Sequence, residues 1–113
     1  AIFFFFFLSG LNGQNFAFNG YLPVKEKELL RKLKDLEKRS RNENQSQFFI
    51  ETPYRSQRLL NFLIRHLNPG TLLHLSMDLY HKDEFLKTAR ISEWRNIKVP
   101  EREKPLCIFG IQA

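Results

Sequence analysis

The stretch Gln47-Phe-Phe-Ile-Glu-Thr-Pro-Tyr-Arg55 decides the fold, because an apolar run ends abruptly in a carboxylate, a proline, an aromatic ring and a guanidinium. Aromatic and β-branched side chains suit a pleated surface, so residues 48–50 predict a buried strand. Pro53 cannot extend a central strand, and the residue before a proline avoids the helical region, so the chain turns there. Glu51 and Arg55 are therefore expected at the carboxyl end of a strand and the opening of a helix, where open α/β sheets bind their ligands.

Helices and strands are predicted to alternate on both sides of this stretch. Upstream, the alternating residues 16–21 predict a strand, and leucines at helical spacing predict a helix over 25–39, followed by a polar linker over 40–46. Downstream, the sequence predicts a helix over 56–67, strands over 71–79, 84–88 and 105–111, and a short helix over 91–96. The expected fold class is therefore α/β, with a mixed sheet of about five strands flanked by helices.

Positive charge is concentrated in the predicted helix that precedes the strand at 48–50. The chain has 113 residues, enough for one domain or a piece of one, and a net charge of +6. Residues 25–41 hold eight Lys or Arg residues against four acids. Such a stripe suits contact with phosphate, although a solvated helix face is the more ordinary interpretation.

The single cysteine and the apolar first residues indicate in which cellular compartment the protein is expected. Cys107 lies in an apolar run and is expected to be a buried small side chain, and a lone cysteine fits a reducing cytoplasm. The apolar residues 2–8 are too few to span a membrane and lack the charged lead of a signal peptide. The five phenylalanines Phe3–Phe7 need cover from this domain, a second copy or a preceding domain, so we expect the chain to be part of a longer protein.

Most catalytic and metal-binding motifs are not matched. His66, His74 and His81 do not form a ligand pair with a nearby carboxylate or thiolate, so no metal site is predicted, and His74 is expected to be a hydrogen-bonded histidine of a core or edge strand. No glycine-rich phosphate loop and no nucleophile elbow occurs. Tyr21, Tyr54 and Arg55 are candidates to stack on or clamp a nucleotide, whereas Tyr54 alternatively packs on the first turn of its helix.

Several segments together resemble a known family. Ser9-Gly-Leu11, then Phe16-x-Phe18-x-Gly-Tyr-Leu-Pro23, a basic helix and Glu51-x-Pro-Tyr-Arg55 are similar to the carboxy-terminal half of tetrapyrrole (corrin/porphyrin) methylases. Within that superfamily they look most like the branch that methylates a ribose 2′-hydroxyl of small-subunit ribosomal RNA. The resemblance covers residues 9–111, and departures such as Tyr54 in place of the usual His bear on the RNA substrate more than on the fold.

The resemblance implies the carboxy-terminal half of a two-domain methyltransferase that uses S-adenosylmethionine, is cytoplasmic and is usually a homodimer. Residues 1–113 form a single domain in this interpretation, and the glycine- and proline-rich cofactor loop belongs to the missing amino-terminal domain. This fragment alone is therefore expected to be inactive. Matching positions imply these cofactor-binding residues: Thr52, Pro53, Tyr54, Met77, Asp78, Leu79, Pro105 and Leu106.

Glu51 is the candidate general base, since it is the carboxylate at the predicted cleft. Its alternative role is an ion pair with Arg55, four residues further on. The candidate substrate-binding residues are Tyr21, Lys25, Arg55 and Arg58. Three functions stay open: a methyltransferase acting on ribosomal RNA, a methyltransferase acting on a tetrapyrrole, and a binding or dimerisation domain without activity in this form.

Overall fold

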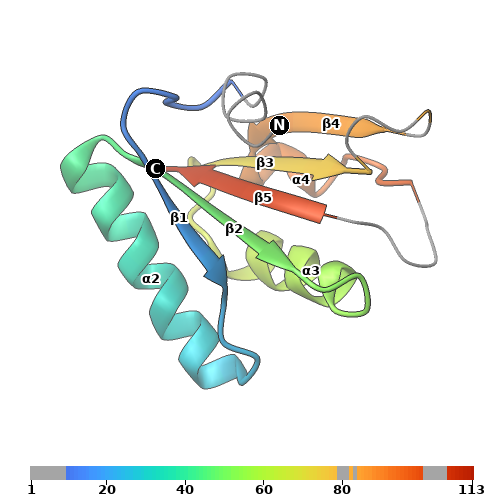
Figure 1. Cartoon of the computed structure of the whole chain (residues 1–113), viewed down its shortest axis with the longest axis horizontal. Coiled ribbons are helices and arrows are strands. Elements are labelled where there is room, and N and C mark those ends of the chain that lie inside the picture. The colour runs from blue at the N-terminus through green and yellow to red at the C-terminus, as the bar shows by residue number, and fades with distance from the viewer. Residues whose placement is uncertain (1–9, 79–81, 83, 101–106) are drawn as a thin grey trace.

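The chain forms a five-stranded mixed sheet whose helices pack on one face (Figure 1). The structure is a computed structural model that describes residues 10–78, 82, 84–100 and 107–113. The α/β class and the mixed sheet predicted from the sequence are confirmed. In chain order the elements are β1 (Phe16–Tyr21), α2 (Glu26–Glu43), β2 (Ser46–Glu51), α3 (Ser56–His66), β3 (Leu72–Met77), β4 (Phe85–Arg90), α4 (Ile91–Trp94) and β5 (Cys107–Gln112).

The order of the strands across the sheet is β1-β2-β5-β3-β4. Strand β1 is parallel to β2, whereas β5 is antiparallel to both of its neighbours, β2 and β3. Strands β1, β2 and β3 therefore run in the same direction. Their last residues, Tyr21, Glu51 and Met77, reach the same end of the sheet, the side at which the strands finish. We call this the carboxyl edge; β5 begins there, because Cys107 pairs with both Glu51 and Met77.

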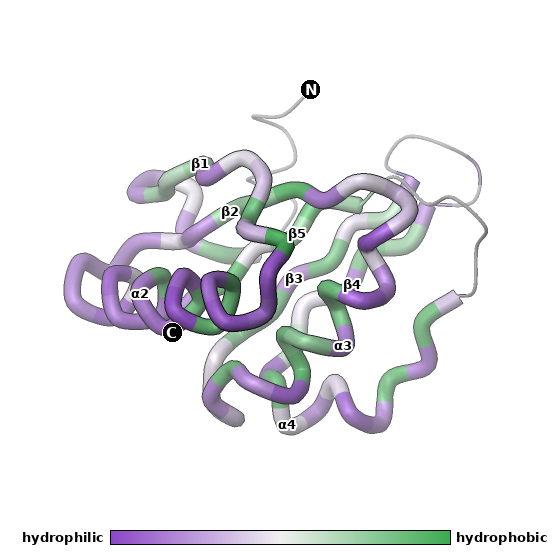
Figure 2. The backbone as a smooth tube through the Cα atoms, turned by 90° about the horizontal axis from the view of Figure 1, so that it is seen from below, coloured by the Kyte–Doolittle hydropathy of each residue, from purple (hydrophilic) through white to green (hydrophobic). Residues whose placement is uncertain are grey.

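A single large core lies between the helices and the sheet. Phe49 and Phe109 stack at its centre with their ring centroids 5.7 Å apart. Most of the leucines predicted to face inward from the two long helices are buried there, and Leu30 is partly buried. Trp94, the last residue of α4, closes the core, and its indole N–H donates to the carbonyl of Leu73 at 2.9 Å. By contrast, α2 is largely hydrophilic along its length (Figure 2), because only one narrow stripe of it faces the core.

Helix α2 is longer than predicted, and the expected polar linker over 40–46 is wrong. The helix continues to Glu43 and ends at Asn44, which takes the left-handed conformation with φ 49°. Polar side chains replace leucine on its buried face: the Ser40 hydroxyl accepts a hydrogen bond from the backbone N–H of Ala113 at 2.9 Å. Glu37 is also buried, so the last turns carry an inward face that the leucine pattern does not reveal.

The sheet face opposite the helices, here the second face, carries Phe48 and His74. The ring of Phe48 is fully buried and pairs with Gly110 of β5. His74 is buried as well, with Nδ1 2.6 Å from Thr88 Oγ1 and Nε2 2.6 Å from Ser76 Oγ. The predicted hydrogen-bonded core histidine is thus confirmed, and burial lowers the pKa of His74 to about 4.

The remaining boundaries differ from prediction by a few residues. The strands predicted over 71–79 and 84–88 are Leu72–Met77 and Phe85–Arg90, and the short helix ends at Trp94. Phe3–Phe7, Leu79, Pro105 and Leu106 lie outside the described residues. Within the described part of the chain, no helix is long and apolar enough to cross a membrane.

Candidate functional site

The described residues predicted to bind cofactor lie at the carboxyl edge, although they come from two separate parts of the sequence. Glu51 ends β2, and the turn 52–54 follows it directly. Met77 ends β3 and Asp78 comes next, on the far side of β5. This convergence follows from the topology, because parallel strands deliver their carboxyl ends to one edge.

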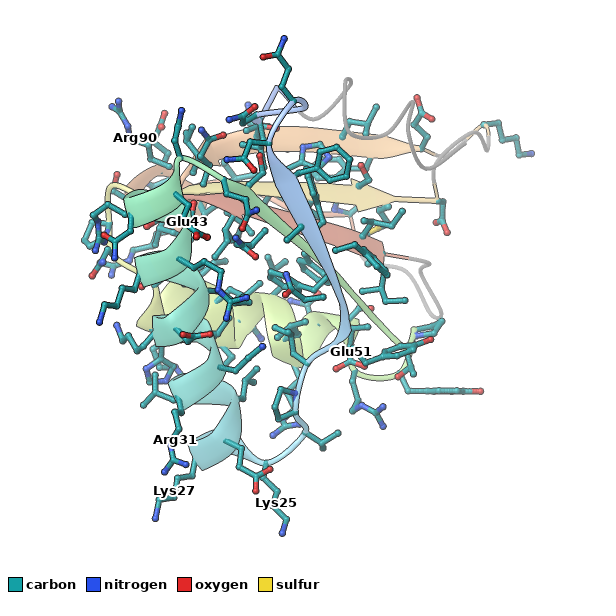
Figure 3. The ribbon with its side chains drawn as sticks, turned by 60° about the vertical axis from the view of Figure 1, so that its left-hand side comes forward. Lys25, Lys27, Arg31, Glu43, Glu51 and Arg90 are labelled. Atoms are coloured by element: carbon teal, nitrogen blue, oxygen red, sulfur yellow. The ribbon has the colours of Figure 1, made fainter. Side chains whose placement is uncertain are left out.

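The carboxylate of Glu51 organises the turn between β2 and α3. Its Oε1 accepts the backbone N–H of Thr52 at 2.7 Å and the Nε–H of Arg55 at 3.3 Å. The Glu51 side chain is only 6% exposed, whereas that of Arg55 is 41% exposed. The predicted ion pair is therefore present, and it orients the carboxylate at the edge of the sheet (Figure 3).

The turn itself contains an unsatisfied polar atom. The carbonyl of Thr52 accepts hydrogen bonds from the N–H of Arg55 at 3.0 Å and from the hydroxyl of Ser56 at 2.9 Å, which start α3. The Thr52 hydroxyl oxygen, in contrast, is buried and has no hydrogen-bond partner within the described structure. An unsatisfied buried hydroxyl costs on the order of 1–3 kcal/mol, so the turn carries a local energetic cost at this position.

Of the predicted substrate-binding residues, some are exposed to solvent and one makes contacts within the protein. Tyr21 is 62% exposed at the end of β1, and Lys25 precedes α2 and projects into solvent (Figure 3). Arg58 is instead used internally: its Nη2 donates to the carbonyl of Val24 at 3.0 Å and lies 4.0 Å from the carboxylate of Glu26. Arg58 thereby joins α3 to the segment that leads into α2.

Tyr54 is 76% exposed, so most of its side chain is not covered by the first turn of α3. The predicted stacking residues Tyr21 and Tyr54 therefore both present their rings to solvent near the ends of adjacent strands.

The other half of the edge is formed by β3 and β5. Asp78 takes a left-handed backbone conformation with φ 52°, which an aspartate tolerates better than most residues and which ends the strand sharply. A cavity of about 10 Å³ is lined by Ser56, Met77 and Cys107 among other residues. That volume holds no more than about one water molecule. This cavity is therefore too small to hold a cofactor.

Sequence reasoning misses the roles of two residues at this edge. Ser56 is predictable only as the start of a helix, yet its hydroxyl binds the carbonyl of Thr52. Cys107 is buried as predicted, but its place between Glu51 and Met77 depends on β5 inserting between β2 and β3. The serine follows Pro53 at a helix start, which is a readable signal, whereas the cysteine has none. Among the described residues, no three His, Cys, Asp or Glu side chains gather as a metal site.

Comparisons with known proteins give a likeness of fold. No model of a protein family matches the sequence, and no curated protein matches it. Among solved structures, the methyltransferase CobJ superposes with a TM-score of 0.58 over 99% of this chain, at 13% sequence identity. The chain spans about half of that protein, since the match covers 47% of it.

Proposed function

We propose that this chain supplies one half of an S-adenosylmethionine-dependent methyltransferase, with the carboxyl edge as one wall of the cofactor cleft. The observation that carries the proposal is the convergence of the turn 52–54 and the Met77–Asp78 segment on that edge. The occurrence of the same fold in the methyltransferase CobJ supports it.

The residues at the edge fit a polar cofactor. The Thr52 hydroxyl has no partner among the described residues that would compete with the cofactor for a hydrogen bond once the turn exposes it, and Pro53 and Tyr54 extend the same wall. Met77 and Asp78 provide the corresponding wall at the end of β3. When bound, S-adenosylmethionine supplies an electrophilic methyl group on a sulfonium sulfur. Leu79, Pro105 and Leu106 stay predicted contacts of the cofactor.

The roles of Glu51 and Arg55 are primarily positional. Glu51 uses Oε1 to hold the Thr52 backbone and the Arg55 guanidinium, and this fixes the turn that carries the Thr52 hydroxyl. Positioning is most of what methyl transfer requires, because the displacement is in line. That Glu51 accepts a proton from the substrate stays a prediction. Its Oε2 atom would take the proton, since Oε1 already accepts two hydrogen bonds.

The second half of the site is expected on another domain. CobJ is about twice as long as the region that matches, and this chain contains no glycine-rich phosphate loop. We therefore propose a two-domain enzyme, of which this chain alone is inactive. A cytoplasmic location and a homodimer stay expectations from the sequence resemblance.

A tetrapyrrole is the substrate class that we favour. It fits the likeness to CobJ better than RNA does. The peripheral carboxylates of such a substrate would meet the cations around the edge, Lys25 and Arg55.

Ribosomal RNA is the second candidate, and helix α2 favours it. Lys27, Arg31, Lys38 and Arg41 are spaced by three to seven residues and share one side of the helix, which places them in a row. Within the described structure none of them forms an ion pair, and Lys27 and Arg31 project away from the sheet (Figure 3). Such a row suits successive phosphates.

A transfer assay with tritiated S-adenosylmethionine tests the proposal. Full-length protein carrying this chain is incubated with a polycarboxylate tetrapyrrole or with small-subunit ribosomal RNA. We expect Thr52→Val to raise the KM for S-adenosylmethionine about ten-fold through loss of one hydrogen bond, with Thr52→Ser as the matched control that keeps the hydroxyl. Absence of transfer to either substrate would refute the methyltransferase proposal.

The RNA alternative has its own test. Replacing Lys27, Arg31, Lys38 and Arg41 by Gln should reduce the salt dependence of RNA binding by about 0.7 in log–log slope for each phosphate that the helix no longer neutralises. An unchanged slope would remove α2 from RNA recognition and leave the tetrapyrrole.

A further inference from the structure

An irregularity near the end of β1 changes the direction of one aromatic side chain. Phe18 pairs with Phe48, but the next recorded pair joins Tyr21 to Ile50. Strand β1 thus advances three residues while β2 advances two, which is a β-bulge with one extra residue. Gly20 supplies the left-handed backbone conformation of the bulge, with φ 64°.

The bulge moves Tyr21 to the second face of the sheet. In a regular strand, Tyr21 would share the helix-facing side of Ala17, which pairs with Gln47. With the extra residue, Tyr21 aligns with Ile50 and lies on the side of Phe18 and Phe48. Bulges next to binding sites commonly redirect a side chain in this way.

The bulge is held in place by a specific contact. The side-chain amide of Asn19 donates to Gln47 Oε1 at 3.1 Å and to the carbonyl of Phe48 at 3.3 Å. These bonds tie the extra residue to β2, so the position of Tyr21 is built into the sheet.

The ring of Tyr21 is one of several exposed aromatic rings in this part of the sheet. Tyr21 is 62% exposed, Phe18 is 47% exposed, and Tyr54 lies just beyond Ile50, the partner of Tyr21. The same carboxyl edge carries the partly exposed guanidinium of Arg55, which contacts Glu51 at the end of β2. Exposed rings beside cations are suited to a planar conjugated ring that carries negative groups.

We infer that Tyr21, directed by the bulge and accompanied by Tyr54, is a specificity-determining residue that stacks on a planar conjugated ring of an anionic substrate. This inference deepens the proposed function and rests on it for the identity of the reaction. The same chemistry occurs in a tetrapyrrole macrocycle and in a nucleobase, so the experiment has one arm for each.

The test measures ring binding directly, without S-adenosylmethionine. Two probes, uroporphyrin III and a fluorescein-labelled single-stranded RNA hexamer, are titrated into the chain and into its variants. We expect Tyr21→Ala and Tyr21→Leu to weaken binding of one probe about ten-fold, since a leucine keeps apolar area but has no aromatic face. Tyr21→Phe should bind like the unmodified chain, and Val24→Ala is the control for an exposed apolar neighbour without a ring.

Deletion of Gly20 tests the role of the bulge. It removes the extra residue and should weaken binding as much as Tyr21→Ala while Tyr21 is still present, with circular dichroism to check the fold. If the deleted chain does not fold, the Tyr21 series decides the matter by itself.

Uroporphyrin binding alone indicates a tetrapyrrole, and RNA binding alone indicates a nucleobase. Binding of neither probe at millimolar concentration, equal binding by Tyr21→Leu, or burial of Tyr21 between two copies of the chain would overturn the inference. Ring binding by a protein that transfers no methyl group would refute the proposed reaction and leave the stacking site intact. Methyl transfer without ring binding would support the proposed reaction and refute the stacking site.

Discussion

The Oε1 atom of Glu51 lies 3.3 Å from Nε of Arg55, in an ion pair that joins the end of β2 to the residue immediately before α3. The pair connects a nearly buried carboxylate to a guanidinium that is 41% exposed. It therefore differs from the pair between Asp35 and Arg39 on α2, where the carboxylate side chain is 51% exposed.

This difference gives a prediction on stability. Arg55→Ala should lower the free energy of unfolding by about 1 kcal/mol, because the Glu51 carboxylate loses one of its two donors. Arg39→Ala, the matched control, should lower it by less than about 0.5 kcal/mol. Urea denaturation measures both, and equal losses would show that the partial burial of Glu51 has no energetic effect.

A second prediction concerns Glu37, a buried carboxylate that joins α2 to the loop before β3. Its Oε2 accepts the hydroxyl of Thr71 at 2.7 Å and the backbone N–H of Asn68 at 2.9 Å. Glu37→Ala should lower the free energy of unfolding by about 3 kcal/mol, because the buried hydroxyl of Thr71 and the partly buried N–H of Asn68 lose a charged acceptor. Glu28→Ala, on the exposed side of the same helix, should cost less than about 0.5 kcal/mol. A loss below about 1 kcal/mol for Glu37→Ala in urea denaturation would contradict this role.

A third prediction concerns pH and His74. Burial lowers the folded-state pKa of His74 to about 4 from its ordinary value of 6.5, so below pH 6.5 the unfolded chain binds more protons than the folded chain. Stability should therefore fall as the pH decreases from 6.5 toward 4, by about 2–3 kcal/mol between pH 7 and pH 4.5 from this group. Urea denaturation at the two pH values should show a smaller decrease for His74→Gln than for the unmodified chain. The same decrease in both proteins would assign the effect to other groups.

A fourth prediction concerns the contact between Gly110 and Phe48. A Cβ atom at Gly110 would lie 2.6 Å from a ring carbon of Phe48 and 2.9 Å from a methyl carbon of Leu11. Gly110→Ala should therefore lower the free energy of unfolding by about 1–3 kcal/mol through overpacking. Gly70→Ala is the matched control, since a Cβ atom at Gly70 would meet no atom of a non-adjacent residue within 4 Å. The thermal unfolding midpoint compares them, and an unchanged midpoint for Gly110→Ala would mean that Phe48 moves without cost.

Local patterns in the sequence predicted the elements well and their assembly poorly. The alternation of residues 16–21 and the leucine spacing of α2 indicated the correct element types, because both report which side chains face the core. The insertion of β5 between β2 and β3 could not be predicted, since pairing over such sequence distances leaves no local signal. Glu37 was missed for a related reason: its burial depends on donors from Asn68 and Thr71, more than thirty residues away.

In the candidate site, too, the local features were predictable and those that depend on strand pairing were not. The turn after Glu51 was predictable from Pro53 and the apolar run, and its ion pair from the spacing of four residues. The redirection of Tyr21 could not be predicted, because a bulge is defined by two strands together and residues 16–21 alone indicate a single regular strand.

An amide NMR titration of the chain with S-adenosylmethionine tests the central claim most directly. The account predicts weak, millimolar binding, with shifts confined to the carboxyl edge at Thr52, Asp78 and Cys107, because one wall of the cleft is present. Shifts at the opposite edge, near Ser46 and Leu72, or no shifts at millimolar concentration would contradict the assignment of that wall. A micromolar dissociation constant would contradict the claim that half of the pocket belongs to another domain.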